Sequence, residues 1–431
     1  MQTSLQGIIN KARKEKRHRF NNLYSILNEE FLLDTWKTIN KKSASGIDKL
    51  TAEEYGKNLK ENISCLVEKL KNKKYHAKLI KRVYIPKGEG KLRPLGLPSL
   101  EDKLVQAGVA RVLSAIFEQD FIENSYGYRP RLSPHDAIKS ITKTLQFGLY
   151  GYIVEADIKG FFDNVNHDWL IKMLEQRVND KALIRLIKKW LKAGIMETDG
   201  KIIHPHTGTP QGAIVSPILA NIYLHYALDL WFEKVVKRHC DGEVYICRYA
   251  DDFICAFRFK RDAIKFFKSL KLRLNKFSLE LAEDKTKILK FNRFAKEESE
   301  TFDFLGFTFY YGIDRKGKVR IKRKTSRKKL KKSLKTFKDW CKEHRNCRLR
   351  KIFDLLNSKL RGYYNYYGLI GNYEAIRKFY LLAMKILFKW LNRRSQRRSF
   401  NWYEFNQKLK YYKVEMPRTT EKVLHQLSFR F

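Results

Sequence analysis

Apolar and polar positions follow two different periods along this 431-residue chain. Residues 101–121 carry aliphatic side chains at helical spacing, which predicts a helix with one buried face. In residues 81–100, β-forming residues flank a Gly-rich turn and predict a hairpin with a basic tip. Residues 302–311 have a further β-pattern, and residues 216–230 predict a long helix. The pattern therefore indicates a protein of mixed helix and sheet.

Two loops carry residues that favour the start of a helix. Asp48 or Thr51 is predicted to cap the helix that follows residue 51. In the same way, Asn164 or Asn166 is predicted to cap a helix that begins near residue 167. These caps fix where a loop ends and a helix begins.

Changes in composition indicate the domain boundaries. The N-terminal segment is charged and has the apolar spacing of a basic helical extension. Of residues 315–335, thirteen are Lys or Arg, and this concentration marks the last boundary, beyond which the pattern is helical, aromatic and basic. The predicted domains are residues 1–45, 46–312 and 313–431.

Carboxylates lie where two predicted strands meet turns. Asp157 ends the strand in residues 150–165, and Asp251 and Asp252 are predicted in a tight turn between the two apolar runs of residues 243–259. Turns favour aspartate, which is the simplest explanation of each one. Three carboxylates brought together could instead hold two Mg²⁺ ions about 3.5–4 Å apart, as phosphoryl transfer to a polynucleotide end requires.

The charge of the chain points to a polyanionic partner. Lys and Arg number 89 against 46 Asp and Glu, a formal net charge of +43 that is spread over the whole length. The hydrophobic fraction of 43% excludes a disordered basic tail. The six cysteines form no CxxC pair, which predicts a reduced intracellular setting, and no apolar stretch predicts a membrane span or a membrane partner.

The motifs around these carboxylates resemble those of one family. RYADDF matches the YxDD box of reverse transcriptases, and the neighbouring blocks follow in the family's order between about residues 46 and 309. The chain resembles a group II intron-encoded reverse transcriptase/maturase, in the form without a C-terminal HNH endonuclease. The other matching blocks are SGIDKLT, RVYIPKGEGKLRPLGLPSLEDKLVQ, NSYGYRPRLSPHDA, VEADIKGFFDNVNHDWL, GTPQGAIVSPILANIYL, LAEDKTKI and FDFLGFTF, with KLRGYYNYYG and KWLNRRSQRRSFNW similar to the maturase region.

The resemblance implies a fold and a catalytic centre. It implies an α+β, right-hand polymerase fold, with palm and fingers followed by a helical thumb/maturase (X) domain. Asp157, Asp251 and Asp252 would be the catalytic carboxylates of the palm and would bind two Mg²⁺ ions. The carbonyl of Ile158 would assist with a metal.

The resemblance also implies a nucleotide site. Lys87 and Arg93 match the fingers residues that hold the incoming triphosphate, although a solvated hairpin would have the same composition. Gln211 matches the glutamine that contacts the nucleotide sugar, and its alternative is a polar loop residue. Phe162 resembles the steric gate that selects deoxynucleotides, where a core aromatic is the alternative, and Lys285 resembles the lysine of the following block. Ala213 replaces a second glycine after PQG and leaves Gln211 in place.

The function implied is RNA-directed DNA synthesis in a mobile element. The chain would copy intron RNA into cDNA for retrohoming and would bind the same RNA to assist its splicing as a maturase. Its partners would be group II intron RNA, an RNA template, a DNA primer, dNTPs and target DNA. The expected location is the bacterial cytoplasm or nucleoid, and an organelle is the less favoured alternative. The predicted nucleic-acid-binding residues, which could also form solvated faces, are Arg323, Lys324, Arg327, Lys328, Arg393, Arg394, Arg397 and Arg398.

Two other functions and one other site stay open at the level of sequence. A freestanding, domesticated reverse transcriptase in antiviral defence or CRISPR adaptation keeps the same motifs, and a splicing-only maturase would bind RNA without synthesis. The missing HNH-type module predicts that this chain does not cleave target DNA. Cys341, His344 and Cys347 have three-residue spacing, but an ordinary helix is favoured over a zinc site because no fourth ligand lies nearby.

Overall fold

The computed structural model describes residues 5–88, 91–314, 316–394 and 399–421. The chain divides into two compact units. The first unit contains Met1–Ser140 and Val154–Ile288, and the second contains Ile141–Ile153 and Leu289–Phe431. The predicted boundaries at residues 45 and 312 describe functional domains rather than compact units, and they stay predictions.

The N-terminal segment is helical, but it is not one helix. Asn22 has a positive φ of 55°, which interrupts the chain after α1. Residues 23–31 have the apolar spacing of a single helix, yet a new helix begins within them, because the Asn28 side chain accepts a hydrogen bond from the Phe31 N–H and caps α2. Thr51 is confirmed as a cap, in a reciprocal capping box with Glu54. The elements are α1 (Leu5–Lys14), a 3₁₀ turn (Tyr24–Ile26), α2 (Glu29–Thr38), α3 (Ala52–Lys57) and α4 (Leu59–Lys71).

The predicted hairpin is confirmed as two antiparallel strands, β1 (Ile80–Gly88) and β2 (Lys91–Leu97). These strands belong to a sheet of order β2-β1-β5-β6, with β5 at Ile195–Met196 and β6 at Ile202–Ile203. The register shifts between Pro86 and Gly88, where β1 bulges.

The helix predicted in residues 101–121 is α5 (Leu100–Phe117). It is buried on nearly every side rather than on one face. Polar residues on it are accordingly paired, as Asp102 is by Tyr75 and Ser99, and as Gln106 is by the backbone N–H of Ile214.

A four-stranded sheet of order β10-β3-β8-β7 carries the predicted carboxylates. Strands β7 and β8 form the predicted hairpin, and Tyr249 pairs with Asp252. One prediction is corrected here, because Asp252 is the first residue of β8 and the turn itself holds Ala250 and Asp251. The strands are β3 (Tyr152–Ala156), β7 (Val244–Tyr249), β8 (Asp252–Phe257) and β10 (Lys287–Lys290), and a separate pair joins β4 (Ile158–Lys159) to β9 (Glu280–Leu281).

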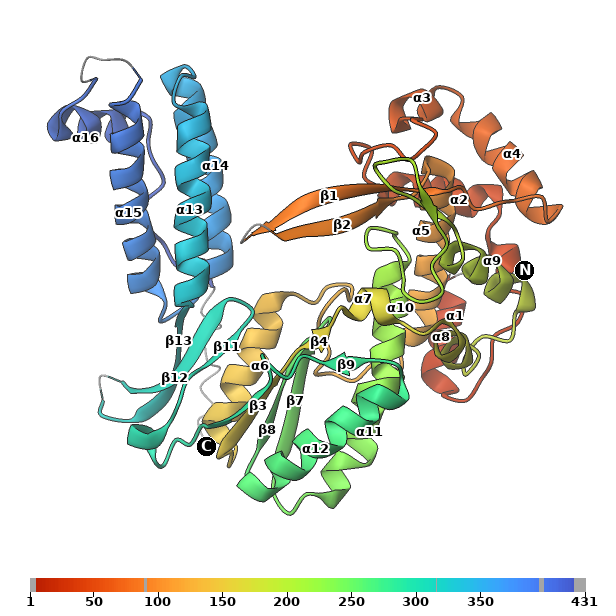
Figure 1. Ribbon diagram of the computed structural model, residues 1–431, viewed down its shortest axis with the longest axis horizontal. Helices are drawn as coiled ribbons and strands as arrows, with labels where there is room; N and C mark the ends of the chain where they lie inside the picture. The colour runs from red at the N-terminus through yellow and green to blue at the C-terminus, as the bar shows by residue number, and fades with distance from the viewer. Residues whose placement is uncertain (1–4, 89–90, 315, 395–398, 422–431) are drawn as a thin grey trace. The chain divides into compact units, whose positions relative to one another are not determined.

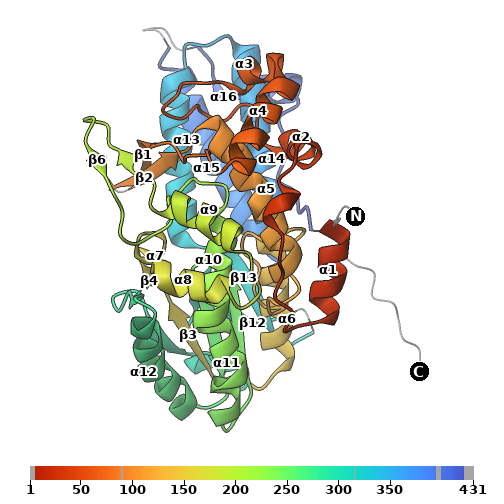
Figure 2. The same ribbon diagram turned by 90° about the vertical axis from the view of Figure 1, so that its right-hand side faces the viewer.

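The helices between residues 134 and 276 include a π turn. The helix predicted over residues 216–230 consists of α10, a π turn and α11, which run end to end in Figures 1 and 2. Asn166 is confirmed as the cap of α8, since its side chain accepts from the Trp169 N–H. The bounds are α6 (Pro134–Phe147), α7 (Phe161–Asn164), α8 (His167–Leu174), α9 (Lys181–Leu191), α10 (Ser216–Leu224), the π turn (His225–Asp229), α11 (Leu230–Lys234), a 3₁₀ turn (Val236–His239) and α12 (Lys260–Lys276).

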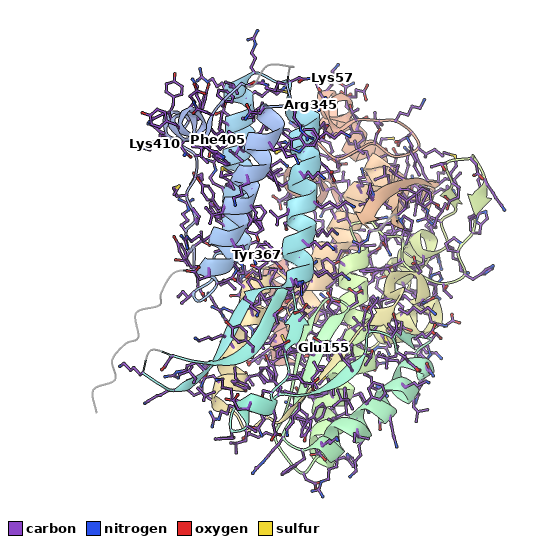
Figure 3. All side chains as sticks on the ribbon, turned by 60° about the vertical axis from the view of Figure 1, so that its left-hand side comes forward. Lys57, Glu155, Arg345, Tyr367, Phe405 and Lys410 are labelled. Atoms are coloured by element: carbon purple, nitrogen blue, oxygen red, sulfur yellow. The ribbon has the colours of Figure 1, made fainter. Side chains whose placement is uncertain are left out.

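The second unit joins a small sheet to a helical bundle. Helices α13, α14 and α15 lie side by side, and α13 packs on α15 (Figure 1). Tyr367 at the end of α14 lies beside the sheet, while Phe405 and Lys410 mark α16 near the opposite end of α15 (Figure 3). The elements are a 3₁₀ turn (Lys296–Glu298), β11 (Phe302–Phe304), β12 (Phe307–Ile313), β13 (Val319–Thr325), α13 (Arg327–His344), α14 (Leu349–Tyr367), α15 (Tyr373–Leu391) and α16 (Trp402–Tyr411).

One prediction is confirmed and one is wrong in this unit. The β-pattern of residues 302–311 forms β11 and β12, which are separated by a turn where Leu305 and Gly306 both take positive φ values. Residues 319–325, predicted as part of a helical domain, form β13, which pairs with β12. In β13, Val319, Ile321 and Thr325 alternate with basic residues, and a period of two is typical of a strand.

No helix among the described residues is long and apolar enough to cross a bilayer.

Candidate active site and nucleic-acid surface

Asp157 lies at the end of β3, in the four-stranded sheet of order β10-β3-β8-β7. It follows β3 directly, and its backbone carbonyl accepts a hydrogen bond from the Ala282 N–H at 2.8 Å. Its carboxylate Oδ2 lies 2.6 Å from the ammonium Nζ of Lys285. The pKa of Lys285 is raised, chiefly by this hydrogen bond and by the charge of Asp157, with smaller contributions from Asp284 and Asp252. Asp157 and Asp252 therefore act on the same ammonium.

Asp251 and Asp252 project from the β7–β8 hairpin. The side chain of Asp252 is exposed, and that of Asp251 is partly buried. Burial raises the pKa of the nearby Tyr128 hydroxyl, and the negative charges of Asp251 and Asp252 raise it further, while the guanidinium of Arg93 lowers it. Tyr128 thus lies among the two carboxylates of the hairpin and the cation of β2. No sequence signal distinguished Tyr128 from a core tyrosine.

The carboxylates have the chemistry of a divalent-cation site. Their oxygens are the hard ligands that Mg²⁺ prefers, and the Lys285 ammonium already places a positive charge against Asp157. Ile158, whose carbonyl was expected to assist, is buried at the start of β4 and pairs with Leu281. Among the residues that the structure describes, no three His, Cys, Asp or Glu side chains are arranged to hold a metal ion.

The GTPQG loop is fixed by backbone hydrogen bonds next to Phe162. The Thr209 N–H donates to the Phe162 carbonyl at 2.7 Å, and the Gly96 N–H donates to the Gln211 carbonyl at 2.6 Å. The partly buried Phe162 ring meets the Tyr128 ring edge to face, with centroids 6.4 Å apart. The structure thus brings Phe162, Tyr128 and the loop of Gln211 together.

The contact between the loop and β2 depends on glycine. Gly212 has a φ of +109°, and a Cβ atom on it would lie 2.6 Å from the Gly96 carbonyl oxygen. This close approach fixes the loop of Gln211 against the strand of Arg93.

The two basic residues of the hairpin have different surroundings. Arg93 is exposed on β2, opposite Ile85 on β1. Lys87 occupies the bulge of β1, and its side chain is not among those described.

The predicted nucleic-acid residues of the second unit fall into three groups. Arg327 and Lys328 are exposed in the first turn of α13, and the ammonium of Lys324 lies 4.9 Å from the Tyr310 ring centroid. Arg393 and Arg394 follow α15, where Arg393 lies over the Trp390 ring. Arg397 and Arg398 lie outside the described residues.

Arg323 differs from the other predicted cations. Its side chain is buried and pairs with Glu421 at 2.6 Å, and it also donates to the Thr142 hydroxyl. Because this guanidinium is already paired inside the unit, we leave Arg323 out of the proposed nucleic-acid surface.

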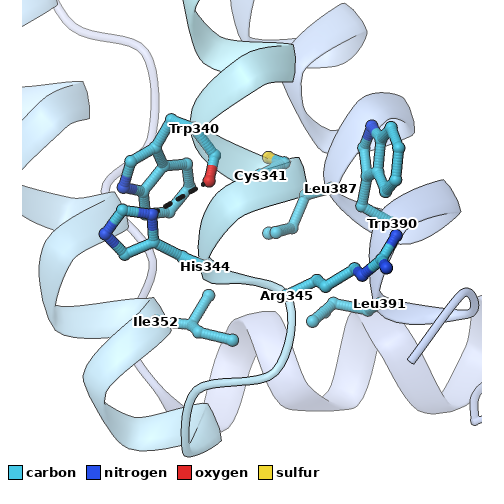
Figure 4. Close-up of a pocket in the computed structure, with 8 residues that line it drawn as sticks. All are labelled: Trp340, Cys341, His344, Arg345, Ile352, Leu387, Trp390 and Leu391. Carbon is cyan, nitrogen blue, oxygen red and sulfur yellow. Dashed lines mark hydrogen bonds between the residues drawn. The ribbon is translucent and has the colours of Figure 1, made fainter. Parts of the chain in front are cut away.

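The CKEHRNC segment belongs to the end of α13 and lines a small apolar pocket (Figure 4). Cys341 is buried, and burial raises the pKa of its thiol to about 12. The His344 ring stacks on Trp340, and its Nδ1 lies 3.1 Å from the Trp340 carbonyl oxygen. Helix packing accounts for both side chains.

The sequence matches a known family across half of its length. Residues 85–309 match the model of the reverse transcriptase (RNA-dependent DNA polymerase) family. The group II intron-encoded protein LtrA of Lactococcus lactis is 30% identical over 430 residues, which cover 80% of this chain and 69% of LtrA. Protein YkfC of Escherichia coli is 31% identical over 64% of this chain and 78% of YkfC. A nuclear intron maturase of Arabidopsis thaliana is 27% identical over 25% of this chain and 15% of the maturase.

The chain is therefore an RNA-dependent DNA polymerase of mixed helix and sheet. It belongs to the group II intron-encoded reverse transcriptases and maturases. Members of this family use divalent metal ions and act on RNA, which agrees with the carboxylates of the first unit and the +43 charge of the chain.

Proposed function

We propose that this reverse transcriptase extends the 3′-hydroxyl of a DNA primer on an RNA template at Asp157, Asp251 and Asp252. The single observation that carries the assignment is that Asp157 follows β3 directly, and β3 pairs with β8, the strand that begins with Asp252 after the turn of Asp251. In the right-hand description, the first unit supplies fingers and palm and the second supplies the thumb, with Val319–Thr325 as a strand at its start.

Two Mg²⁺ ions bound by these carboxylates would supply charge neutralisation for the attacking and leaving oxygens. Lys285 donates a hydrogen bond to Asp157 and would leave it when a metal ion replaces the ammonium. Arg93, on the same side as Tyr128, is in place to contact the triphosphate of the incoming dNTP, and Lys87 is proposed beside it. The rigid contact between Gly96 and the Gln211 loop holds the sugar-binding side of the site.

We propose that exposed cations of the second unit bind the phosphates of intron RNA, and that the same cations bind the phosphates of target DNA. Helix α13 begins with Arg327, Lys328 and Lys329 and has no acidic residue in its first turn. Cations at a helix N-terminus are unfavourable by about 0.3–1 kcal/mol each, so this arrangement makes sense if a polyanion compensates it.

Primer extension tests the catalytic assignment. The substrate is poly(rA)/oligo(dT) with Mg²⁺, and the wild type is compared with the Asp251→Asn/Asp252→Asn variant. The matched control is Asp284→Asn, since Asp284 is an exposed carboxylate that also acts on Lys285. We expect synthesis by the wild type and the control, and at least about a thousandfold loss in the double variant. Synthesis by the double variant would overturn the assignment.

Intron splicing separates the two roles of the chain. Splicing of a group II intron is measured with the wild type and with the double variant. Because the carboxylates are proposed for synthesis alone, we expect the double variant to support splicing. A wild type that binds RNA and supports splicing without any synthesis would instead favour the splicing-only maturase.

A further inference from the structure

The β7–β8 turn contacts a buried ion pair whose arginine begins the RYADDF block and whose aspartate lies outside the matching blocks. Arg248, three residues before Asp251, and Asp229 are both fully buried. The Nε and Nη2 atoms of Arg248 donate to the two carboxylate oxygens of Asp229 at 2.8 and 2.6 Å. A bidentate pair of this kind fixes the plane of the guanidinium.

The remaining guanidinium nitrogen reaches the turn itself. Nη1 of Arg248 donates to the backbone carbonyl of Ala250 at 3.0 Å and to the side-chain oxygen of Asn221 at 3.1 Å. Ala250 has a φ of 58°, a left-handed conformation that alanine seldom adopts without support. The hydrogen bond from Arg248 supplies that support immediately before Asp251.

The same network reaches the opposite side of the site. Asn221 donates through Nδ2 to the Gly127 carbonyl at 2.7 Å, and Gly127 precedes Tyr128 in the chain. A Cβ atom on Gly127 would lie 2.2 Å from the Ala250 nitrogen, so the two backbones are in direct contact. Arg248 therefore connects the turn of the carboxylates with the segment of Tyr128.

The π turn at His225–Asp229 explains how Asp229 faces Arg248. Asn221 and Asp229 are eight residues apart, and in an uninterrupted α-helix they would differ by about 80° around the axis. A π turn spreads an extra residue over its turn and removes most of that difference, so both side chains face Arg248. Burial lowers the pKa of the neighbouring His225 to about 4, so its ring is neutral at pH 7 and does not compete with Arg248 as a cation.

We propose that Arg248, held by Asp229 and Asn221, is the positioning residue of the polymerase site: it sets the backbone of Ala250 and thereby the place of the Asp251 and Asp252 carboxylates. The inference rests on the proposed catalytic role of those carboxylates. Lysine cannot replace Arg248, because a single ammonium cannot hold the planar bidentate contact with Asp229 and also reach Ala250.

Single-turnover addition of one dNTP to a primer tests this role, because the amplitude reports the fraction of active enzyme and the rate constant reports each active site. The variants are Arg248→Lys and Asn221→Ala, the second of which leaves the buried ion pair intact. Arg177→Lys is the matched control, since Arg177 is buried and paired with Asp120 away from this turn. Asp251→Asn is included to test the catalytic carboxylate itself.

We expect the rate constant to fall at least about tenfold in Arg248→Lys and about threefold or more in Asn221→Ala. We also expect a severalfold higher Mg²⁺ concentration for half-maximal rate, an unchanged affinity for template-primer, and a wild-type rate constant in Arg177→Lys. Wild-type rate constants with reduced amplitudes in Arg248→Lys and Asn221→Ala would show that Arg248 only stabilises the fold and would overturn the inference. A wild-type rate constant in Asp251→Asn would instead overturn the proposed function.

Discussion

Among the described residues, Lys285 supplies the charged group that lies within hydrogen-bond distance of Asp157. The pair is partly exposed, so its contribution to the free energy of unfolding is small, about 0–1 kcal/mol. The pair therefore matters for the chemistry of the site more than for the stability of the fold. Because Asp157 binds the Lys285 ammonium weakly, it is suited to exchanging that ammonium for a metal ion.

Replacement of Phe162 tests its role at the nucleotide sugar. Phe162→Ala removes the ring that meets Tyr128, and the site should then accept the 2′-hydroxyl of a ribonucleotide. We expect the preference for dNTP over rNTP to fall by about tenfold to a hundredfold, because a lost steric contact changes discrimination more than the rate. Steady-state incorporation of dTTP and rUTP measures this ratio. An unchanged ratio in a folded variant would assign Phe162 to the core instead.

Titration of His225 predicts how stability depends on pH. Its folded pKa of about 4 lies below its ordinary value of 6.5, so between these values the unfolded chain binds more protons than the folded chain. Stability should therefore fall as the pH drops from about 6.5 to 4, by up to about 3 kcal/mol from this group. Urea unfolding at pH 7 and pH 4.5 should show a smaller loss in His225→Gln than in the wild type. His239→Gln, at an exposed histidine, should match the wild type, and equal losses in all three proteins would contradict the prediction.

At the scale of elements, the sequence predicted regular helices and strands well, but it did not predict the places where they are interrupted. The β1–β2 hairpin, α5 and the caps Thr51 and Asn166 were predicted from local signals. The π turn was not, because residues 216–230 have the same apolar pattern with or without one extra residue in a turn. Strand β13 was missed because its many lysines and arginines obscured a period of two.

The Gln211 loop gives a prediction with an internal control. Gly212→Ala adds a Cβ against the Gly96 carbonyl at a φ of +109°, whereas Gly200→Ala has a similar φ of +87° with nothing within 4 Å. Both variants bear a conformational cost of about 1 kcal/mol, but only Gly212→Ala disturbs the contact with β2. We expect kcat/KM for dNTP to fall about tenfold in Gly212→Ala and to stay within about twofold in Gly200→Ala. Equal effects of the two substitutions would mean that the contact with Gly96 does not matter for nucleotide binding.

At the scale of the whole molecule, the net charge of +43 governs binding to RNA. Each phosphate that the protein neutralises releases counterions, so affinity depends steeply on salt. With about 6–10 phosphate contacts, the affinity for structured RNA should fall by about 10³–10⁵ between 50 and 200 mM salt. Filter binding across this range measures the slope, and a flat dependence would argue against an electrostatic interface.

Variants at the start of α13 test where that interface lies. Arg327→Ala/Lys328→Ala removes two exposed cations from the helix N-terminus, so the salt slope should become shallower by about 2 while the fold becomes slightly more stable. Lys260→Ala/Arg261→Ala removes the corresponding cations from the first turn of α12 and serves as the control. A larger change of slope in the control would place the RNA on the first unit.

The sequence by itself determined the family and most of the regular elements, and it predicted Asp157, Asp251 and Asp252 as the catalytic carboxylates. These depend on local order and spacing, which a linear chain displays directly. The tertiary structure decided which residues meet: Lys285 with Asp157, Tyr128 with the hairpin, and Arg248 with Asp229. It also placed Arg323 inside the second unit, although Lys324, the next residue in the sequence, is exposed. Burial and ion pairing join residues far apart in the chain, and a one-dimensional pattern does not contain those distances.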